Sequence, residues 1–406
     1  MSPRSEGVWR HRDARLLLSS QAISVLGDGV GNIAFALLVL NLTHSPSRLG
    51  WFSAARLVPM VALLLFGGAL VDRWSRRTIM VVSDLGRGIA TGLIALLASV
   101  HHVNFTELLA FAVVFGAFDS IYTPALGALA PDIVTESLLA PLNASRSLTS
   151  MLFGQLLGPA LGGVVSAVSV SGAVAADGVT FFLSALILGA LRPAPTPPTH
   201  LQPSLLRDVK VGLAYVRSTP WIWMTLLAVA VINGILFSPA SLVVIVLLRH
   251  TLHDSGATVG VVIAVGGIGG ALGALAAGRW GRPRRRVRVM WLCWASSGLA
   301  NLVIALALTN WVIAVGFLAA APGIVLGNVI WESMMQSEVP RELLGRVTSV
   351  DWLLSLGLSP LGVAFAGALV QRVGPSWYLG VTSVLVVAVA VVLAGSRRAN
   401  QVDRGR

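Results

Sequence analysis

The stretch Gly67-Gly-Ala-Leu-Val-Asp-Arg-Trp-Ser-Arg76 decides the fold, because it recurs as Gly273-Ala-Leu-Ala-Ala-Gly-Arg-Trp-Gly-Arg282. Each copy lies at the basic end of the second long apolar run in its half of the chain. The same offset at matching positions predicts a parallel repeat, in which six apolar helices are followed by six more.

The composition excludes an ordinary soluble enzyme. The chain has 406 residues, of which 55% are hydrophobic and 11% charged, whereas soluble domains carry about 25% charged residues. The mean hydropathy is +0.82. Because one bilayer crossing needs about 20 apolar residues, we predict twelve spans, at 16–41, 49–71, 78–100, 106–130, 146–168, 172–191, 221–248, 257–278, 288–308, 311–335, 346–370 and 377–395.

The basic residues set the orientation. The net charge is +12, and all but one of the 29 basic residues are Arg, scattered in short groups between the apolar runs. That pattern is typical of cytoplasmic loops and makes a nucleic-acid groove improbable. With both termini in the cytoplasm, 24 basic residues lie inside, three lie outside, and Arg56 and Arg87 lie within spans. We therefore expect a multi-pass protein of the inner (cell) membrane with both termini cytoplasmic and a retained first span.

The domain organisation follows from composition. Residues 1–191 and 221–406 each hold six spans, and residues 192–220 contain six prolines, which indicates an extended cytoplasmic linker. Within the linker, Leu205–Arg217 is predicted as a short amphipathic helix on the membrane surface. Cys293 is the single cysteine, the histidines lie in tails or loops, and no phosphate-binding loop motif occurs. We expect no cofactor, no metal and no enzymatic activity.

Two acids lie deepest in the predicted spans and are candidates for proton coupling. Asp28 stands between Gly27 and Gly29 in span one, and Asp119 stands in span four. An ionisable group at mid-bilayer costs about 2.5–3.5 kcal/mol on insertion scales, so it is a functional candidate by default. The alternative is a structural hydrogen bond between helices, and the residues leave both open.

Other membrane charges receive a structural interpretation. Arg56 is expected to pair with Asp28 by depth. Asp84 and Arg87 are three residues apart near the inner end of span three and are expected to pair on one helix face. Three further acids are expected at the membrane interface, namely Asp177, Glu332 and Asp351.

The residues resemble the major facilitator superfamily along the whole chain. Gly68-Ala-Leu-Val-Asp72-Arg73-Trp-Ser-Arg76-Arg77 is similar to its G-x-x-x-D-R-x-G-R-R signature, with Ser75 in place of Gly. In span five, Gly154-Gln-Leu-Leu-Gly158-Pro159-Ala-Leu-Gly162-Gly163 matches the G-x-x-x-G-P-x-x-G-G signature of drug-exporting antiporters. The preceding Leu142-Asn-Ala-Ser145 resembles the enterobactin and macrolide exporter branch. Span four departs from classical drug/proton antiporters, since Asp119 stands where they carry a membrane Arg.

The resemblance implies an all-α membrane protein with twelve transmembrane helices in two six-helix bundles. It also implies a gate in which Asp72 interacts with the neighbouring arginines Arg73, Arg76 and Arg77, although Arg-rich inner loops serve topology in any case. Spans one, four, seven and ten line the central cavity in this superfamily. Helical spacing then makes these residues candidates for substrate contact or for interhelical hydrogen bonds: Asn32, Tyr122, Asn233, Phe237, Asn328 and Trp331.

We therefore expect a secondary transporter that exports a small amphipathic compound, drug-like or natural product, by alternating access in exchange for protons. Its expected partners are the small-molecule substrate, protons and membrane lipid, without nucleic acid, and it is expected to act as a monomer. A proton- or sodium-coupled importer and a lipid or siderophore transporter are the alternatives on the same fold. A polytopic enzyme is disfavoured because no span carries His or catalytically spaced acid pairs, and a non-transporting receptor would show binding without flux.

Overall fold

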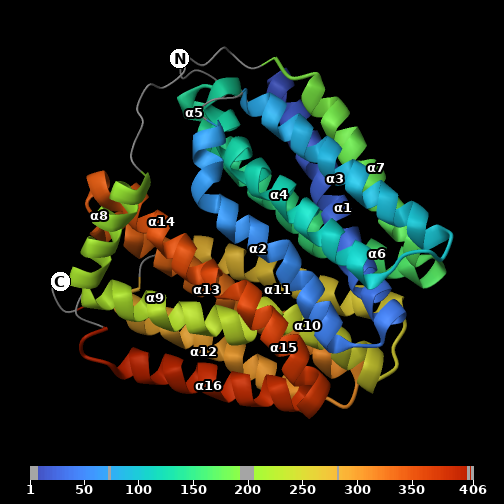
Figure 1. Ribbon diagram of the computed structural model, residues 1–406. Helices are drawn as coiled ribbons and strands as arrows, with labels where there is room; N and C mark the ends of the chain where they lie inside the picture. Colours follow the sequence, from blue (N-terminus) through green and yellow to red (C-terminus); the bar gives the residue numbers. More distant parts are fainter. Residues whose placement is uncertain (1–7, 72–74, 193–204, 281–282, 400–402, 404–406) are drawn as a thin grey trace. The chain divides into compact units, whose positions relative to one another are not determined.

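The computed structural model describes residues 8–71, 75–192, 205–280, 283–399 and 403. In these ranges the chain forms helices and no strand. Eleven helical segments are long and apolar enough to cross a membrane, and α2 (Pro46–Val71) supplies the twelfth crossing. The fold is thus all-α with twelve membrane helices in two bundles, as predicted (Figure 1).

The first compact unit comprises residues 1–44 and 55–201. Within it, α1 and α3 both pack along α7, and α3 also packs against α4 (Figure 1). Besides the later part of α2, its crossings are α1 (Arg12–Thr43), α3 (Arg76–Ser99), α4 (Phe105–Ile133), the composite of α5 (Glu136–Thr149), η2 (Ser150–Leu157) and α6 (Gly158–Val168), and α7 (Val170–Gly189).

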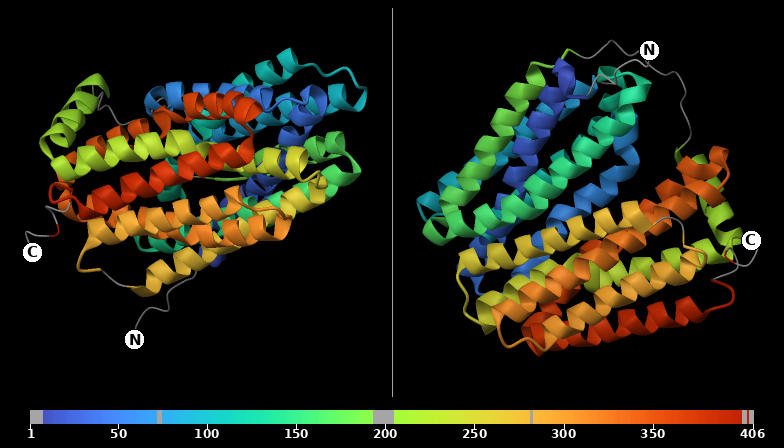
Figure 2. Two further views of the ribbon diagram at one scale, coloured as in Figure 1. Left: turned by 90° about the horizontal axis from the view of Figure 1, so that it is seen from below. Right: turned by 180° about the vertical axis from the view of Figure 1, so that it is seen from behind.

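The second unit comprises residues 45–54 and 202–406. Its helix α13 packs against both α11 and α12, and α12 packs against α16 (Figure 2). The crossings are the composite of α9 (Pro220–Ile232), η3 (Asn233–Phe237), α10 (Ser238–Val246) and η4 (Leu247–Thr251), then α11 (Gly256–Trp280), α12 (Arg286–Ala305), α13 (Asn310–Glu338), α14 (Arg341–Gly357) continued by α15 (Ser359–Val373), and α16 (Pro375–Gly395).

The helix predicted within the linker is present as α8 (Leu205–Ser218). It packs against α14 and groups with the second unit. A Cβ atom on Gly212 would lie only 2.6 Å from the backbone oxygen of Arg346. The absence of a side chain at Gly212 therefore allows α8 to rest directly on the backbone of α14.

Local sequence explains where helices begin and where they change pitch. Asn104 and Glu107 form a reciprocal capping box that starts α4. Three crossings change conformation just before a proline: η2 precedes Pro159, η3 precedes Pro239, and α14 ends before Pro360. Proline lacks the N–H for the helical ladder and clashes with the preceding turn, so the helix widens or breaks there.

Candidate functional site

The loop expected to act as a gate is described in part. Asp72 and Arg73 lie outside the described residues, and Gly68 stands in the last turn of α2. Arg76, the first residue of α3, donates a 2.6 Å hydrogen bond to Asp132 Oδ1 on α4. This charge-assisted contact fixes the start of α3 against the end of α4 within the first unit.

Arg77 ties the same end of α3 to α7. Its guanidinium donates to the carbonyl oxygens of Leu188, at 3.2 Å, and of Gly189. These carbonyls belong to the last turn of α7, where the helix dipole attracts cations. Both described arginines of the loop therefore bind neighbouring helix ends.

The glycine motif of the fifth crossing is the surface that receives α1. A Cβ atom on Gly158 would lie 2.7 Å from Gly29 Cα, and one on Gly162 would lie 2.8 Å from Val30 Cα. The two backbones therefore touch at the level of Asp28, which larger residues would prevent. The motif consists of Gly154, Gly158, Pro159, Gly162 and Gly163, and the last four are buried.

Asp28 lies in the middle of α1 between two arginines. Its carboxylate oxygens are 3.8 Å from Arg56 on α2 and 3.8 Å from Arg87 on α3. About a quarter of its side chain is exposed. Arg56 also donates a 2.8 Å hydrogen bond to Asn32 Oδ1, one turn further along α1. The expected approach of Arg56 to Asp28 is present, as a long contact rather than a tight one.

Arg87 is the centre of the polar network, which its sequence neighbours did not indicate. It lies in the middle of α3 rather than near an end, and its side chain is 1% exposed. It donates to Asp84 on the same helix and, at 3.2 Å, to Asp119 on α4. Ser184 of α7 donates a further 2.6 Å hydrogen bond to Asp84. The Asp84–Arg87 pair is therefore one part of a cluster that joins α1, α3, α4 and α7.

Aromatic rings enclose the two guanidinium groups. Arg87 lies 4.5 Å from the ring centroids of both Tyr122 and Phe181. Arg56 lies 4.3 Å from the centroid of Phe115. Cation–π attraction of this kind partly replaces the water that the guanidinium groups lose on burial. Tyr122, a candidate for substrate contact, is buried against Arg87 in this structure.

The expectation that Asp177 lies at the interface is wrong. Asp177, on α7, is 2% exposed and its carboxylate lies against Gly31 of α1. Its Oδ1 atom has no hydrogen-bond partner among the described residues. The prediction considered only the position of Asp177 along its own helix. The neighbouring helix α1 covers Asp177, and its residues Gly27 and Gly31 leave room there for the carboxylate.

The first unit thus gathers four carboxylates around two guanidinium groups. With every group ionised, Asp28, Asp84, Asp119 and Asp177 exceed Arg56 and Arg87 by two negative charges. A net charge is costly to the extent that its site is buried, and Asp84 and Asp177 are the buried carboxylates of this set. No group of three or more His, Cys, Asp or Glu side chains in the described ranges could hold a metal ion.

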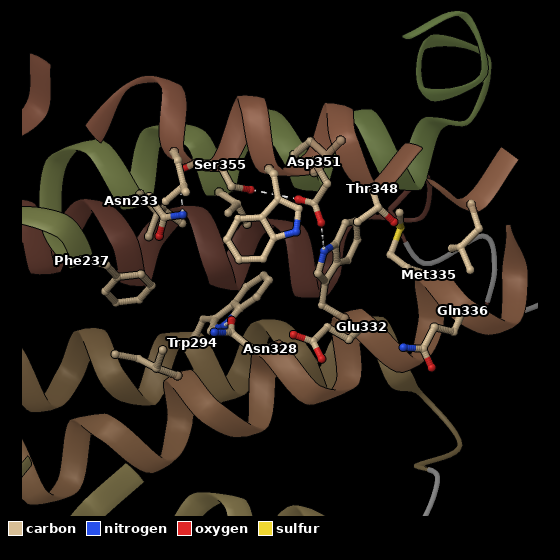
Figure 3. A pocket seen from close by; sticks show the side chains of 18 residues that line it. Asn233, Phe237, Trp294, Asn328, Glu332, Met335, Gln336, Thr348, Asp351 and Ser355 are labelled. Carbon is tan, nitrogen blue, oxygen red and sulfur yellow. Dashed lines mark hydrogen bonds between the residues drawn. The ribbon is translucent and has the colours of Figure 1, made fainter. Parts of the chain in front are cut away.

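The second unit contains a pocket of about 460 Å³ whose lining combines aromatic and acidic side chains (Figure 3). This is the size of small-molecule sites. The four cavity candidates of the second half all line it: Asn233, Phe237, Asn328 and Trp331. The sequence did not single out several other lining residues: Trp294, Met335, Gln336, Thr348, Trp352 and Ser355.

Two carboxylates of the pocket differ in their partners. Asp351 accepts 2.9 Å hydrogen bonds from the indole N–H of Trp331 and from the hydroxyl of Ser355. Glu332 lies on the lining and is exposed there, with its carboxylate directed into the pocket (Figure 3). Both acids were expected at the membrane interface, and helical spacing also put Glu332 on one stripe with Asn328 and Trp331. The structure places both acids on the lining of the pocket.

The charges of the pocket have one sign. Among its lining residues are two carboxylates and no Arg, Lys or His. Trp294 donates a 3.3 Å hydrogen bond to Asn328 Oδ1, and Asn233 donates a 3.0 Å bond to the backbone oxygen of Ser355. These contacts orient the amides without neutralising the acids. The pocket is therefore lined mainly by apolar side chains, and its charged side chains are acidic.

The comparison with protein families agrees with this architecture. The Major Facilitator Superfamily model matches residues 17–359. The chain belongs to this superfamily. It is accordingly an integral membrane protein for transport and not an enzyme. The superfamily's members bind small-molecule substrates and generally work as monomers.

Two curated superfamily members are similar over most of their length. The multidrug efflux pump Tap of Mycobacterium tuberculosis (strain ATCC 25618 / H37Rv) is 28% identical, over 89% of this chain and 88% of Tap. The enterobactin exporter EntS of Citrobacter koseri is 26% identical, over 94% of this chain and 91% of EntS. A solved bacterial homologue of the lysosomal transporter Spinster is 15% identical, covers 96% of this chain and 97% of its own, and has a TM-score of 0.70, which supports the fold.

Proposed function

We propose that this superfamily member exports small amphipathic compounds by alternating access, in exchange for protons. The observation that carries the proposal is the environment of Asp28. Its carboxylate is partly accessible and is held by two arginines only at 3.8 Å. A proton carrier needs access to solvent and a partner that it can release, and Asp28 has both. Asp119 is the second candidate, since its side chain is equally accessible and Arg87 contacts it at 3.2 Å.

Protonation of Asp28 removes the ion pairs that link α1 to Arg56 on α2 and Arg87 on α3. The neutral carboxyl loses its attraction to Arg56 and Arg87, and Arg87 then remains with Asp84 and Asp119. The interaction that keeps α1 beside α2 and α3 therefore weakens when a proton binds. A change of this kind couples proton uptake to movement of the helix that carries Asp28.

The pocket of the second unit supports a neutral or cationic amphipathic substrate over an anionic one. Its aromatic rings suit an apolar body, and its two carboxylates attract a cation. Tap and EntS carry the names of an efflux pump and an exporter, which supports the outward direction. An importer on the same fold would take up the compound in the same assay.

The proposed transport cycle depends on the two six-helix repeats. The bundles 1–191 and 221–406, joined by the segment 192–220, expose the substrate site to either side in turn. The loop from Gly68 to Arg77 is the proposed gate, and the contact of Arg76 with Asp132 supports a role in holding one state. The distribution of Arg supports a cytoplasmic location for both termini.

An Asp28→Asn variant is expected to lose compound-dependent proton movement. The amide cannot carry the proton, although its shape is close to that of the carboxyl group. Inverted vesicles with a pre-set proton gradient are followed with a pH-sensitive dye while lipophilic compounds are added. We expect wild type to dissipate the gradient and Asp28→Asn to retain less than about a tenth of the wild-type rate. This change corresponds to an increase of about 1.4 kcal/mol or more in the activation free energy.

Asp13→Asn is the matched control, because it makes the same change on the same helix outside the network. Within the described residues, the ion pair of Asp13 is with the adjacent Arg12. It should leave the rate unchanged. If no compound collapses the gradient in wild-type vesicles that contain the folded protein, proton-coupled export of those compounds is wrong.

A Glu332→Gln variant is expected to bind a lipophilic cation about tenfold more weakly. This change corresponds to a loss of about 1.4 kcal/mol of binding free energy. The carboxylate faces the pocket, and no cationic side chain among the lining residues competes for it. Binding is measured by quenching of tryptophan fluorescence, with a neutral aromatic compound in parallel. Glu342→Gln, at the exposed start of α14, is the control. An equal loss for cation and neutral compound would show that Glu332 acts on pocket shape and not on charge.

A further inference from the structure

The carboxyl group of Asp177 is enclosed by α1 in a way that its neighbours in sequence do not explain. A Cβ atom on Gly27 would lie 2.8 Å from Asp177 Oδ1, and one on Gly31 would overlap Oδ2. Both glycines flank Asp28, so the two acids share one stretch of α1. Asp177 is 2% exposed, and its Oδ1 has no hydrogen-bond partner in the described part of the chain.

The charged groups around Asp177 come from three helices. Asp28 on α1, Arg56 on α2 and Arg87 on α3 are close enough to interact with it electrostatically. Asp84, also on α3, accepts the hydroxyl hydrogen bond of Ser184, two turns along α7 from Asp177. Within the described residues, the ion pairs of both arginines run to the other three acids and not to Asp177. Its carboxyl group is therefore the member of the cluster without a cation.

Two protons balance the charge of the cluster. Four aspartates surround two arginines, and a net charge of two is unfavourable in a site where Asp84, Asp177 and Arg87 are buried. Asp84 is held by Arg87 and Ser184, and Asp119 is held by Arg87, so these two are the stabilised carboxylates. The remaining two, Asp28 and Asp177, have the weakest cationic contacts and are the groups on which the protons reside.

We propose that Asp177 is a second proton-binding site, which loads and unloads together with Asp28, so that two protons are exchanged for each compound. The proposal rests on the proposed function. In each cycle the two carboxylates bind two protons on one side of the membrane and release two on the other, with no other bond made or broken. The glycine contacts let α1 separate from α7 without unlocking side chains, which opens Asp177 to solvent.

The first experiment needs no ligand. Infrared difference spectra of the full-length protein in lipid membranes are recorded from acidic to alkaline pH for wild type, Asp177→Asn and Asp28→Asn. We expect a protonated-carboxyl band that fades as the pH rises and is absent from Asp177→Asn, and a second such band absent from Asp28→Asn. A band of Asp177 that persists at every pH would overturn the proposal, because the group would then be a permanent structural hydrogen-bond donor.

The second experiment counts protons. Proteoliposomes with the membrane potential clamped at zero accumulate tetraphenylphosphonium under a pH difference of one unit. Two exchanged protons support a gradient of about 100-fold, and one supports about tenfold. We expect the higher value for wild type and the lower for Asp177→Asn. Equal gradients in the two proteins would overturn the second site, whereas no proton-driven accumulation in wild type would overturn proton-coupled export of this cation itself.

If Asp177→Asn does not fold, the spectra of wild type and Asp28→Asn still test the proposal. The Asp28→Asn protein must then retain one titrating carboxyl band from the cluster. Thr180→Val, which alters the adjacent side chain on α7 that also contacts Gly27, is the packing control and should leave both bands in place. Loss of every titrating band in Asp28→Asn would contradict the proposal.

Discussion

An Arg87→Met variant is expected to lose most of its folded protein. The Arg87 side chain is 1% exposed, and its guanidinium neutralises Asp84 and Asp119 directly and Asp28 at 3.8 Å. Methionine has a similar length but leaves these carboxylates without their cation. Removal of one partner from a buried ion pair costs about 3–5 kcal/mol, a large share of the 5–15 kcal/mol that stabilises a typical domain. Size-exclusion chromatography and thermal unfolding of the purified protein measure the loss.

Arg56→Met is the matched comparison for this variant. Arg56 is 26% exposed and approaches Asp28 only at 3.8 Å, so solvent replaces much of what it contributes. We expect its unfolding temperature to fall much less. Adding Asp84→Asn to Arg87→Met should restore part of the stability, since one unpaired charge is removed. If Arg87→Met melts at the temperature of wild type, the carboxylates are not held by Arg87.

The membrane crossings could be predicted from the sequence because bilayer thickness fixes the length of each apolar run. Several helices nevertheless extend past the predicted windows at both ends. The first span was predicted over 16–41, and α1 runs from Arg12 to Thr43. Polar residues continue a helix beyond the hydrocarbon region, where hydropathy no longer reports it.

The candidate sites were predicted less completely, because depth and spacing along one helix do not show which side chains of a neighbouring helix contact it. Asp28 and Asp119 were identified from depth, and four pocket residues from helical stripes. Arg87 was assigned to a local pair because its partner three residues away was visible, whereas Asp119 is 32 residues distant. Asp177 was placed at the interface because it lies near the outer end of the sixth predicted span. The available signal was the glycine spacing around Asp28, since glycines in a membrane helix mark close approach by another helix.

A Gly158→Val variant is expected to lose transport and part of its stability. Even a Cβ atom at this position would lie 2.7 Å from Gly29 Cα and 2.9 Å from the backbone oxygen of Leu26. Both contacts are backbone and cannot rotate away, so α1 must move away from α6 and carry Asp28 out of reach of Arg56 and Arg87. Overpacking of this kind costs about 1–3 kcal/mol. We expect proton exchange in the vesicle assay to fall to less than about a tenth of the wild-type rate, which corresponds to about 1.4 kcal/mol.

Gly127→Val on α4 separates this packing effect from the general effect of a valine in a membrane helix. No atom lies within 4 Å of a Cβ built at Gly127, so the same substitution meets open space there. Its transport rate and unfolding temperature should stay close to those of wild type. Gly158→Ala should fall between Gly158→Val and wild type, because one methyl group forces a smaller separation of the helices. If Gly158→Val exchanges protons as fast as Gly127→Val, the contact of the motif with α1 does not position Asp28, and the coupling of the motif to the proton site is wrong.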